Sequence, residues 1–256
     1  MKRFGLIGHP IAHSLSPALF KAAYDGKYAY DLIEEDNFEK AYSRFLNEYD
    51  GINVTAPFKE LALAKADILT DDCIAAGATN LLIKTPEGVT AYNSDFSGVR
   101  KWLAEVSEKL ECSRARVLIA GYGGAGKAAA AAARSLGMDI SIVNRTIRDD
   151  NMKPLSEFCN EFRKADIIIY NIPSLIDEVA RLYEKCDNED ASGVKIILEA
   201  NYRNPSFTPE LQKRIRKAYP GAQFVDGKLW LLYQAVTGYE IFTGETPDLE
   251  KMSDVL

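Results

Sequence analysis

The sequence contains few residues of the kinds that build metal sites or disulfide frameworks. Only two of its 256 residues are histidines, His9 and His13, and Pro10 between them disrupts the helix that a four-residue ligand spacing requires. The four cysteines are far apart and show neither C-x-x-C metal spacing nor a compact disulfide pattern: Cys73, Cys112, Cys159 and Cys186. We therefore predict no metal site and four reduced thiols, as is typical of a cytoplasmic protein.

Long basic and long apolar runs are also missing. The net charge is −6, which disfavours nucleic acid and anionic membranes as partners. No apolar run is long enough to cross a bilayer, and the one after Lys2 and Arg3 ends at Gly8, too early for a secretory signal. The 47% apolar content over 256 residues can bury a substantial core, and the length suits one large or two modest domains. We predict two, because a glycine-rich loop that begins only at Gly121 leaves room for a separate domain before it.

The most informative stretch is Arg116–Thr146. A short apolar run, Val117–Ala120, precedes a glycine-rich turn and an alanine-rich helix former, and a second apolar run, Ile140–Val143, follows. This order is typical of a dinucleotide-binding βαβ unit, in which glycines permit a sharp turn and let a pyrophosphate approach the backbone at the helix N-terminus. The alternative is a glycine turn that only packs. We predict that the turn residues bind the cofactor: Gly121, Gly123, Gly124, Ala125 and Gly126.

The same residues also fit the G-x-x-x-x-G-K pattern of a phosphate-binding loop in kinases and ATPases. That loop needs a Ser or Thr after the lysine to hold magnesium. Here Lys127 is followed by Ala128, which has no hydroxyl. The pattern therefore favours a dinucleotide.

The end of the second strand indicates which dinucleotide. An NAD-specific unit usually has Asp or Glu there, whose carboxylate binds the ribose 2′-hydroxyl. In this chain Asn144, Arg145 and Thr146 instead offer a cation and a hydroxyl to a 2′-phosphate. The sequence thus favours NADP, although Arg145 as an ordinary solvated charge is the alternative.

The first half of the chain also alternates strand and helix, which predicts an α/β fold. Pro17 and Pro57 open two helices, the first with Ser16 as N-cap. Apolar runs predict the strands Phe4–Ile7, Tyr28–Ile33 and Gly51–Val54, a hairpin of Thr79–Lys84 with Val89–Tyr92, and helices over Asn37–Glu48 and Phe96–Leu110.

Two charged residues stand at the starts of these helices. Lys59 falls in the first turn after Pro57, where the helix dipole disfavours a cation. It is either a solvated charge or a lysine adapted for proton transfer. Asp95 belongs to Asn93-Ser94-Asp95, an ordinary N-cap pattern, and Ser14 is equally compatible with a cap. Position alone leaves both interpretations open.

Seven short motifs then occur in order along nearly the whole chain. They are His13-Ser14-Leu15-Ser16-Pro17, Asn53-Val54-Thr55-Ala56-Pro57-Phe58-Lys59, Gly77-Ala78-Thr79-Asn80, Asn93-Ser94-Asp95 with Gly98, the glycine turn, Asn144-Arg145-Thr146, and Asp226-Gly227 leading to Gln234-Ala235. In this order they resemble the motifs of the shikimate dehydrogenase family. The resemblance implies reversible, NADPH-dependent reduction of 3-dehydroshikimate to shikimate, a step of aromatic (chorismate) biosynthesis.

The resemblance also implies roles for individual residues. Lys59 and Asp95 are the expected catalytic pair, and Asn171 and Gly227 join the expected NADP-binding residues. The expected substrate ligands are Ser14, Ser16, Asn53, Thr55, Asn80, Tyr202 and Gln234. The alternative is a non-catalytic, dinucleotide-dependent regulatory or redox-sensing protein on the same fold. Such a protein would not need the lysine and carboxylate together, so their coexistence argues for an enzyme. Shikimate and quinate are not distinguished.

The expected architecture has two domains. Residues 1–98, completed by 226–256, form an α/β substrate domain, and residues 99–225 form a Rossmann-type doubly wound NADP-binding domain. A monomer and a homodimer are equally compatible with the sequence.

The chain departs from the family pattern in three places. Phe20-Lys21 replaces a usual His-Asn pair, for which we expect an effect on packing only. Ile172-Pro173-Ser174 and Leu229-Trp230 replace usual residues near the cofactor. Only 18 residues, Ile147–Lys164, separate Thr146 from the next strand, enough for one helix and its loops. We therefore predict a shortened sheet, with Ile167–Tyr170 close to an edge.

Overall fold

The computed structural model describes residues 2–110, 114–148, 150–182 and 194–256. They form two compact units. The first comprises residues up to Val99 together with Leu231–Leu256, and the second comprises Arg100–Trp230. Helices α5 (Ser94–Lys109) and α10 (Gly227–Thr243) each contribute residues to both units.

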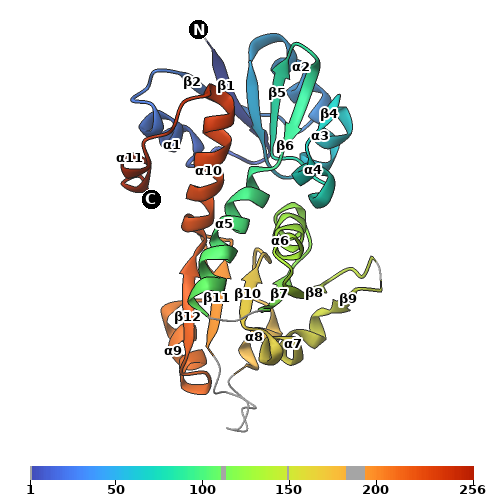
Figure 1. Ribbon diagram of the computed structural model, residues 1–256, viewed down its shortest axis with the longest axis vertical. Coiled ribbons are helices and arrows are strands. Elements are labelled where there is room, and N and C mark those ends of the chain that lie inside the picture. Colours follow the sequence, from blue (N-terminus) through green and yellow to red (C-terminus); the bar gives the residue numbers. More distant parts are fainter. Residues whose placement is uncertain (1, 111–113, 149, 183–193) are drawn as a thin grey trace. The chain divides into compact units, whose positions relative to one another are not determined.

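The first unit contains a mixed sheet with the strand order β2-β1-β3-β5-β6-β4 (Figure 1). Its strands are β1 (Arg3–Gly8), β2 (Ala29–Glu34), β3 (Gly51–Val54), β4 (Ile68–Leu69), β5 (Leu81–Thr85) and β6 (Gly88–Tyr92). Strand β1 pairs in parallel with β2 and β3, and β5 is antiparallel to both β3 and β6. The strands and the hairpin predicted from the apolar runs are confirmed.

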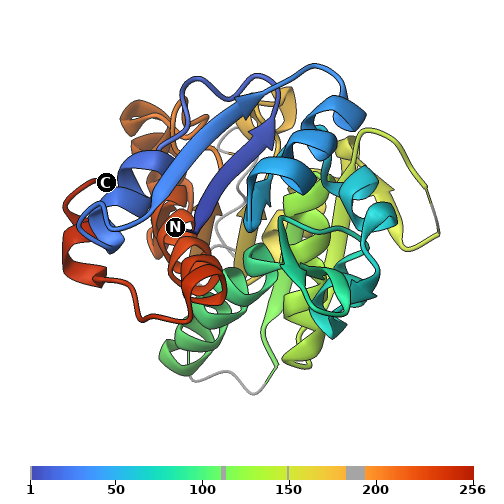
Figure 2. The same ribbon diagram turned by 90° about the horizontal axis from the view of Figure 1, so that it is seen from above.

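Helices cover both faces of this sheet. They are α1 (Ser16–Ala23), α2 (Phe38–Glu48), α3 (Lys59–Lys65), α4 (Asp71–Ala76) and α11 (Leu249–Ser253), together with the C-terminal part of α10. Because side chains alternate along a strand, β1 directs Ile7 to a core with α2 and α3, and Phe4 to a core with α1 and α10. Figure 2 shows β1 and β2 side by side in blue, with α1 next to β2.

Two predicted helix starts need correction. Helix α1 begins at Ser16 itself, its N-cap is Leu15, and no side chain caps it. The serine therefore does not serve as the N-cap, because its backbone is already helical. Helix α3 begins at Lys59 rather than Pro57, so Lys59 is its first residue. The Asn93 cap is confirmed, since its Oδ1 accepts a hydrogen bond of 3.0 Å from the Phe96 N–H.

Phe20, at a position where the family usually has a polar residue, is packed in the core of the first unit. It is 1% exposed, and its ring centroid is 4.8 Å from those of Tyr30 and Tyr239. The ring therefore belongs to the aromatic core between α1 and α10.

The second unit is built on a six-stranded sheet within the described residues, in the order β12-β11-β10-β7-β8-β9, with every pairing parallel. The strands are β7 (Arg116–Ala120), β8 (Asp139–Asn144), β9 (Met152–Pro154), β10 (Ile167–Tyr170), β11 (Lys195–Glu199) and β12 (Ala222–Asp226). The helices lying wholly in this unit are α6 (Gly124–Ser135), α7 (Phe158–Lys164), α8 (Asp177–Ala180) and α9 (Pro209–Ala218), with a 3-10 turn at Leu155–Glu157. This doubly wound order confirms the Rossmann-type prediction.

The predicted shortening of this sheet is wrong. Strand β9 lies inside Ile147–Lys164 and pairs in parallel with β8, and β10 lies between β7 and β11 rather than near an edge. Among its described residues, the segment does hold a single α-helix, α7. A strand fits as well because β9 has only three residues and needs no crossover helix before it.

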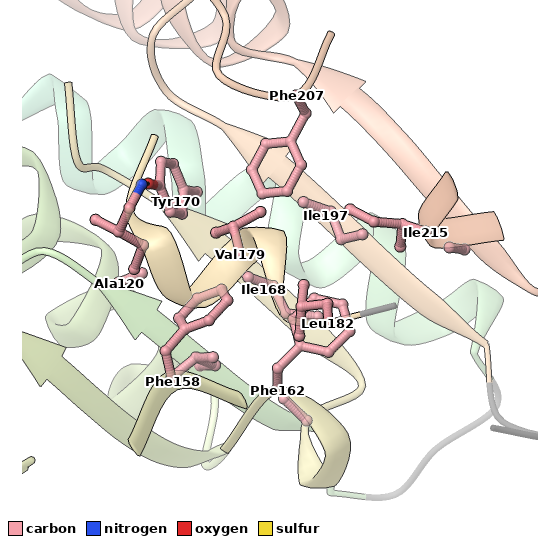
Figure 3. Close-up of a cluster of buried hydrophobic side chains, with 14 of the residues drawn as sticks. Ala120, Phe158, Phe162, Ile168, Tyr170, Val179, Leu182, Ile197, Phe207 and Ile215 are labelled. Atoms are coloured by element: carbon pink, nitrogen blue, oxygen red, sulfur yellow. The ribbon is translucent and has the colours of Figure 1, made fainter. Parts of the chain in front are cut away.

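The core on one face of the second sheet contains several aromatic rings among aliphatic side chains. Phe158 and Phe162 of α7 lie 5.9 Å apart between ring centroids, and Tyr170 of β10 contacts Phe207 at 5.1 Å. Figure 3 shows these rings together with Val179 of α8 and Ile215 of α9, so α7, α8 and α9 share one buried cluster. On α6, the buried alanines let the helix pack against β7 and β8.

Cys73 is a buried thiol, and Cys159 Sγ donates a hydrogen bond of 3.1 Å to the Glu178 carbonyl, while Cys112 and Cys186 lie outside the described residues. Within the described ranges, no helix combines the length and the apolar character that a membrane span requires. Nor do three or more His, Cys, Asp or Glu side chains of these ranges gather where they could hold a metal ion.

Candidate functional site

Predicted substrate ligands of the first unit gather at one edge of its sheet. Ile7 pairs with Val54 across the parallel strands β1 and β3, so the carboxyl ends of these strands lie together. Asn53 is opposite Leu81 of β5, and Leu81 is opposite Tyr92 of β6. The start of β5 and the end of β6 therefore reach the same edge. We call this set the polar edge: Ser14, Ser16, Asn53, Thr55, Lys59, Asn80, Ser94, Asp95 and Gln234.

Lys59 and Asp95 form an ion pair at the polar edge, between Lys59 Nζ and Asp95 Oδ2. Their side chains are only 17% and 15% exposed. Lys59 is the first residue of α3, and its carbonyl accepts a hydrogen bond of 3.3 Å from the Thr79 N–H. The ammonium is thus held beside a carboxylate on two helix starts, an arrangement suited to proton transfer.

Asn80, Ser94 and Gln234 form a hydrogen-bonded group next to this pair. The Asn80 amide donates to Ser94 Oγ (2.9 Å) and Gln234 Oε1 (3.2 Å), and Asn80 Oδ1 accepts from the Ser94 N–H (2.7 Å). A Cβ on Gly98 would lie 2.7 Å from Gln234 N, so only glycine lets α10 bring Gln234 this close to α5. Ser94 was not among the predicted site residues, because Asn93-Ser94-Asp95 has the pattern of an ordinary helix cap.

Asn53 is oriented by Tyr30 of β2. The Tyr30 hydroxyl donates a hydrogen bond of 2.7 Å to Asn53 Oδ1, and the Asn53 amide donates to the Asn80 carbonyl at 3.3 Å. Burial raises the pKa of Tyr30 well above its ordinary value, so the phenol keeps its proton at neutral pH. Sequence reasoning missed Tyr30, because nothing in the local pattern of β2 distinguishes this tyrosine from a core residue.

Three predicted ligands carry hydroxyl groups. Ser14 lies in the loop after β1, Ser16 is the first residue of α1, and Thr55 directly follows β3. Ser14 Oγ donates to Ser16 Oγ at 3.1 Å and accepts from the Ser16 N–H at 3.2 Å. Thr55 is half-buried, and its N–H donates to the Ile7 carbonyl at 2.9 Å. A Cβ on Gly8 would lie 2.4 Å from the Thr55 methyl group, so glycine makes room for Thr55.

The glycine turn of the second unit has the geometry of an anion site at a helix N-terminus. Gly121 has φ +89°, and a Cβ on Gly126 would lie 2.1 Å from the Gly121 carbonyl oxygen. Gly123 is the exposed N-cap of α6, and a Cβ there would meet no atom within 4 Å. The first turn of α6, which includes Gly124 and Ala125, contains no acidic residue. The turn therefore fits a pyrophosphate, since the backbone is open to it and no carboxylate repels it.

Asn144 connects this turn to the end of β8. Its Oδ1 accepts from the Tyr122 N–H at 3.2 Å, and its amide donates to the Thr146 carbonyl at 2.8 Å. Arg145 and Thr146, which follow directly, are exposed. The Asn144 side chain thus fixes the turn relative to the end of β8, and the exposed guanidinium and hydroxyl of Arg145 and Thr146 lie directly after it.

Asn171 and Gly227 flank the ends of the neighbouring strands. Asn171 N–H donates to the Ala120 carbonyl at 2.7 Å, and Asn171 Oδ1 is buried without a hydrogen-bond partner among the described residues. Such an unsatisfied acceptor calls for a donor that the described chain does not supply, which is compatible with a ligand amide. A Cβ on Gly227 would lie 2.4 Å from the Glu199 carbonyl oxygen, so tight packing alone already requires glycine there.

Tyr202 belongs to the second unit, whereas the other predicted substrate ligands belong to the first. Its N–H donates to the Ala200 carbonyl at 3.1 Å, and burial raises the pKa of its hydroxyl. Because Tyr202 and the polar edge belong to different units, its role as a substrate ligand stays a prediction.

Comparisons with known proteins agree with this geometry. The family model of the shikimate dehydrogenase substrate binding domain matches residues 6–82. The model of the D-isomer specific 2-hydroxyacid dehydrogenase NAD binding domain matches residues 79–185. The second match covers the glycine turn, which many dinucleotide-dependent dehydrogenases share.

Full-length relatives extend the match to nearly the whole chain. The shikimate dehydrogenase (NADP(+)) of Maricaulis maris is 33% identical, with 97% of this chain and 92% of that protein aligned. The crystal structure of Mycobacterium tuberculosis shikimate dehydrogenase has a TM-score of 0.77 at 28% identity, covering 100% of this chain and 98% of that one. The Thermus thermophilus shikimate 5-dehydrogenase, solved in complex with NADP(H) and shikimate, has a TM-score of 0.74 at 26% identity, with 100% and 98% covered. Motifs, fold and full-length similarity agree, and the chain belongs to the shikimate dehydrogenase family.

Proposed function

We propose that this protein is an NADP-dependent shikimate dehydrogenase that reversibly reduces 3-dehydroshikimate to shikimate in aromatic biosynthesis. The observation that carries the proposal is the Lys59–Asp95 ion pair on an edge lined by hydroxyl and amide groups. A protein that only bound a dinucleotide would need the glycine turn but not this pair. The named activity of full-length relatives supports the same conclusion.

Lys59 is the proposed proton donor. Reduction of the carbonyl develops negative charge on its oxygen, and an ammonium at that oxygen can neutralise the charge by giving up a proton. In the oxidative direction the same amine removes the hydroxyl proton. Asp95 orients the ammonium through the ion pair and can accept a hydrogen bond from the reacting hydroxyl. Such acid-base catalysis contributes roughly 10²- to 10⁴-fold.

The remaining groups of the polar edge are the proposed substrate ligands. The oxygens of Asn53 and Gln234 already accept hydrogen bonds within the protein. Both side chains therefore present N–H donors to the substrate, and donors suit the oxygens of a polyhydroxy ring. The hydroxyls of Ser14, Ser16 and Thr55 suit its carboxylate. Asn80 completes the set, and Tyr202 is proposed on the family resemblance.

The glycine turn is the proposed NADP site. When bound, NADPH supplies the hydride for the reduction. Gly121, Gly123, Gly124, Ala125 and Gly126 would hold the pyrophosphate at the start of α6, and Asn144, Arg145 and Thr146 the 2′-phosphate. Asn171 and Gly227 complete the proposed set, Asn171 through its unsatisfied carbonyl oxygen. We further propose a cytoplasmic enzyme that is a monomer or a homodimer, which size-exclusion chromatography with light scattering distinguishes.

The decisive experiment is an assay of purified protein against shikimate and quinate, each with NADP and with NAD. We expect NADPH to form with shikimate. Preferred oxidation of quinate would reassign the substrate within the family. If no reduced nucleotide forms with either substrate while calorimetry detects tight NADP binding, the protein is instead a dinucleotide-binding regulator.

A further inference from the structure

The connection between β8 and β9 is unusually short. The two strands are parallel neighbours, and the segment between Asn144 and Met152 comprises only residues 145–151. Parallel neighbours usually need a dozen or more connecting residues, most often with a helix. With so few residues, the position of β9 restricts where the chain can go after β8. Arg145 and Thr146 are the first two residues of that connection.

Strand β9 is itself weakly held by its backbone. It has three residues, lies at the edge of the sheet, and pairs only over Met152–Pro154. One of the three is proline, which has no N–H to donate. Side-chain contacts must therefore contribute to keeping β9 on β8.

Glu161 of α7 provides such a contact. Its side chain is only 6% exposed. Its Oε2 accepts hydrogen bonds from Ser141 Oγ of β8 (2.6 Å) and Lys153 Nζ of β9 (2.8 Å). Its Oε1 accepts from Lys164 Nζ (3.0 Å), which belongs to the same helix. Glu161 Oε2 thus links β8 to β9, whereas Oε1 binds only a lysine of its own helix.

We propose that Glu161 is a positioning residue for NADP selectivity, because its Oε2 holds β9 on β8 and so fixes Arg145 and Thr146 where they meet the 2′-phosphate. The inference rests on the proposed function, in which these two residues bind that phosphate. Neither Glu161 nor Lys153 touches the cofactor in this account. Loss of either side chain should therefore weaken the binding of NADP but not of NAD, because NAD has no 2′-phosphate for Arg145 and Thr146 to bind.

Three variants of the full-length enzyme test the proposal. Lys153→Met removes the bond to β9, and Glu161→Gln removes the charge from Oε2. Lys164→Met is the matched control, because it deletes an ion pair with the same carboxylate but leaves β8 and β9 joined. For the first two variants we expect the KM for NADP to rise roughly threefold to tenfold. The KM for NAD and the kcat with shikimate at saturating cofactor should stay near wild-type values. For Lys164→Met no KM should change.

A merely structural role predicts a different result, in which both cofactors are affected alike or only the melting temperature falls. A direct contact of Lys153 with the phosphate predicts that Glu161→Gln leaves the KM for NADP unchanged or lowers it, since the lysine is then released. Either result would overturn the proposal. If the wild-type enzyme shows no preference for NADP, then Arg145 and Thr146 do not bind the 2′-phosphate, and the proposed cofactor site is itself wrong. If Arg145→Ala abolishes the preference while Lys153→Met and Glu161→Gln do not, only the positioning role fails.

Discussion

Lys59 Nζ and Asp95 Oδ2 meet at one edge of the first sheet although the two residues are 36 positions apart in the chain. We expect Lys59→Ala to lower kcat for shikimate oxidation at least ~10²-fold, the lower end of acid-base contributions. The KM for shikimate should change far less, because the amide and hydroxyl ligands remain. Asp95→Asn should cause a loss of the same kind. Steady-state kinetics at saturating NADP measure both.

Lys65→Ala is the matched control for this prediction. Lys65 ends the same helix, is exposed and pairs with Glu39. Its loss should leave kcat at the wild-type value. Wild-type kcat in Lys59→Ala would show that Lys59 is only a charge at a helix end.

Arg145 is expected to supply most of the preference for NADP. Charge-assisted hydrogen bonds contribute about 1.5 to 3 kcal/mol each and a neutral one from Thr146 about 1 kcal/mol. We therefore expect kcat/KM to favour NADP over NAD on the order of 10- to 10³-fold. Arg145→Ala should raise the KM for NADP and leave that for NAD almost unchanged.

Arg114→Ala serves as the control, since Arg114 is an exposed arginine that pairs with Asp139 at the start of β8. It should leave the preference intact. Equal use of both cofactors by wild-type enzyme, or strong NADP selectivity retained in Arg145→Ala, would mean that the 2′-phosphate binds elsewhere.

Gly126 and Gly123 should respond differently to alanine. A Cβ on Gly126 would overlap the Gly121 carbonyl oxygen at 2.1 Å, so Gly126→Ala must displace backbone and should lower the melting temperature by several degrees. A Cβ on Gly123 meets nothing within 4 Å. Gly123→Ala should therefore keep the melting temperature but raise the KM for NADP, because the methyl group occupies the approach to the α6 N-terminus. Equal melting temperatures for both variants would contradict the packing argument.

The sequence predicted those parts of the fold that depend on local signals. The βαβ unit was predictable because apolar runs, glycines and alanines follow one another within Arg116–Thr146. Strand β9 was not, because Met152, Lys153 and Pro154 are too few to show any alternation and only Met152 is buried. Its place depends on pairing with β8 and on Glu161, which are tertiary effects.

In the candidate site, too, local motifs were predictable and tertiary contacts were not. Family motifs supplied Lys59, Asp95 and most of the proposed substrate ligands, but not the residues that orient them. Tyr30 reaches Asn53 only through the register of β2, β1 and β3, and Ser94 reaches Gln234 only because Gly98 admits α10. Neither contact has a counterpart in the local sequence pattern.

The final prediction concerns stability in acid. Burial on its own raises the pKa of Glu161, but hydrogen bonds from Lys153, Ser141 and Lys164 outweigh it and lower that pKa from 4.5 to about 2. A lowered folded-state pKa contributes stability that is fully present above the unfolded value of 4.5. Between pH 4.5 and about 2 the unfolded state binds a proton that the folded state does not, so this contribution is progressively lost.

Glu161→Gln isolates this effect from the other carboxylates, because glutamine does not titrate. The free energy of unfolding of wild type should exceed that of the variant most at pH 5 to 7, and the difference should shrink by about 1 to 2 kcal/mol as the pH falls toward 3, after allowance for the partly exposed lysines. Urea unfolding followed by circular dichroism at pH 7, 5, 4 and 3 measures it. Glu245→Gln, which removes an exposed carboxylate paired with Lys27, should show a much smaller pH-dependent difference. A difference for Glu161→Gln that is constant with pH would mean that its carboxylate has the same pKa folded and unfolded, and that the contacts with Ser141 and Lys153 do not stabilise its charge.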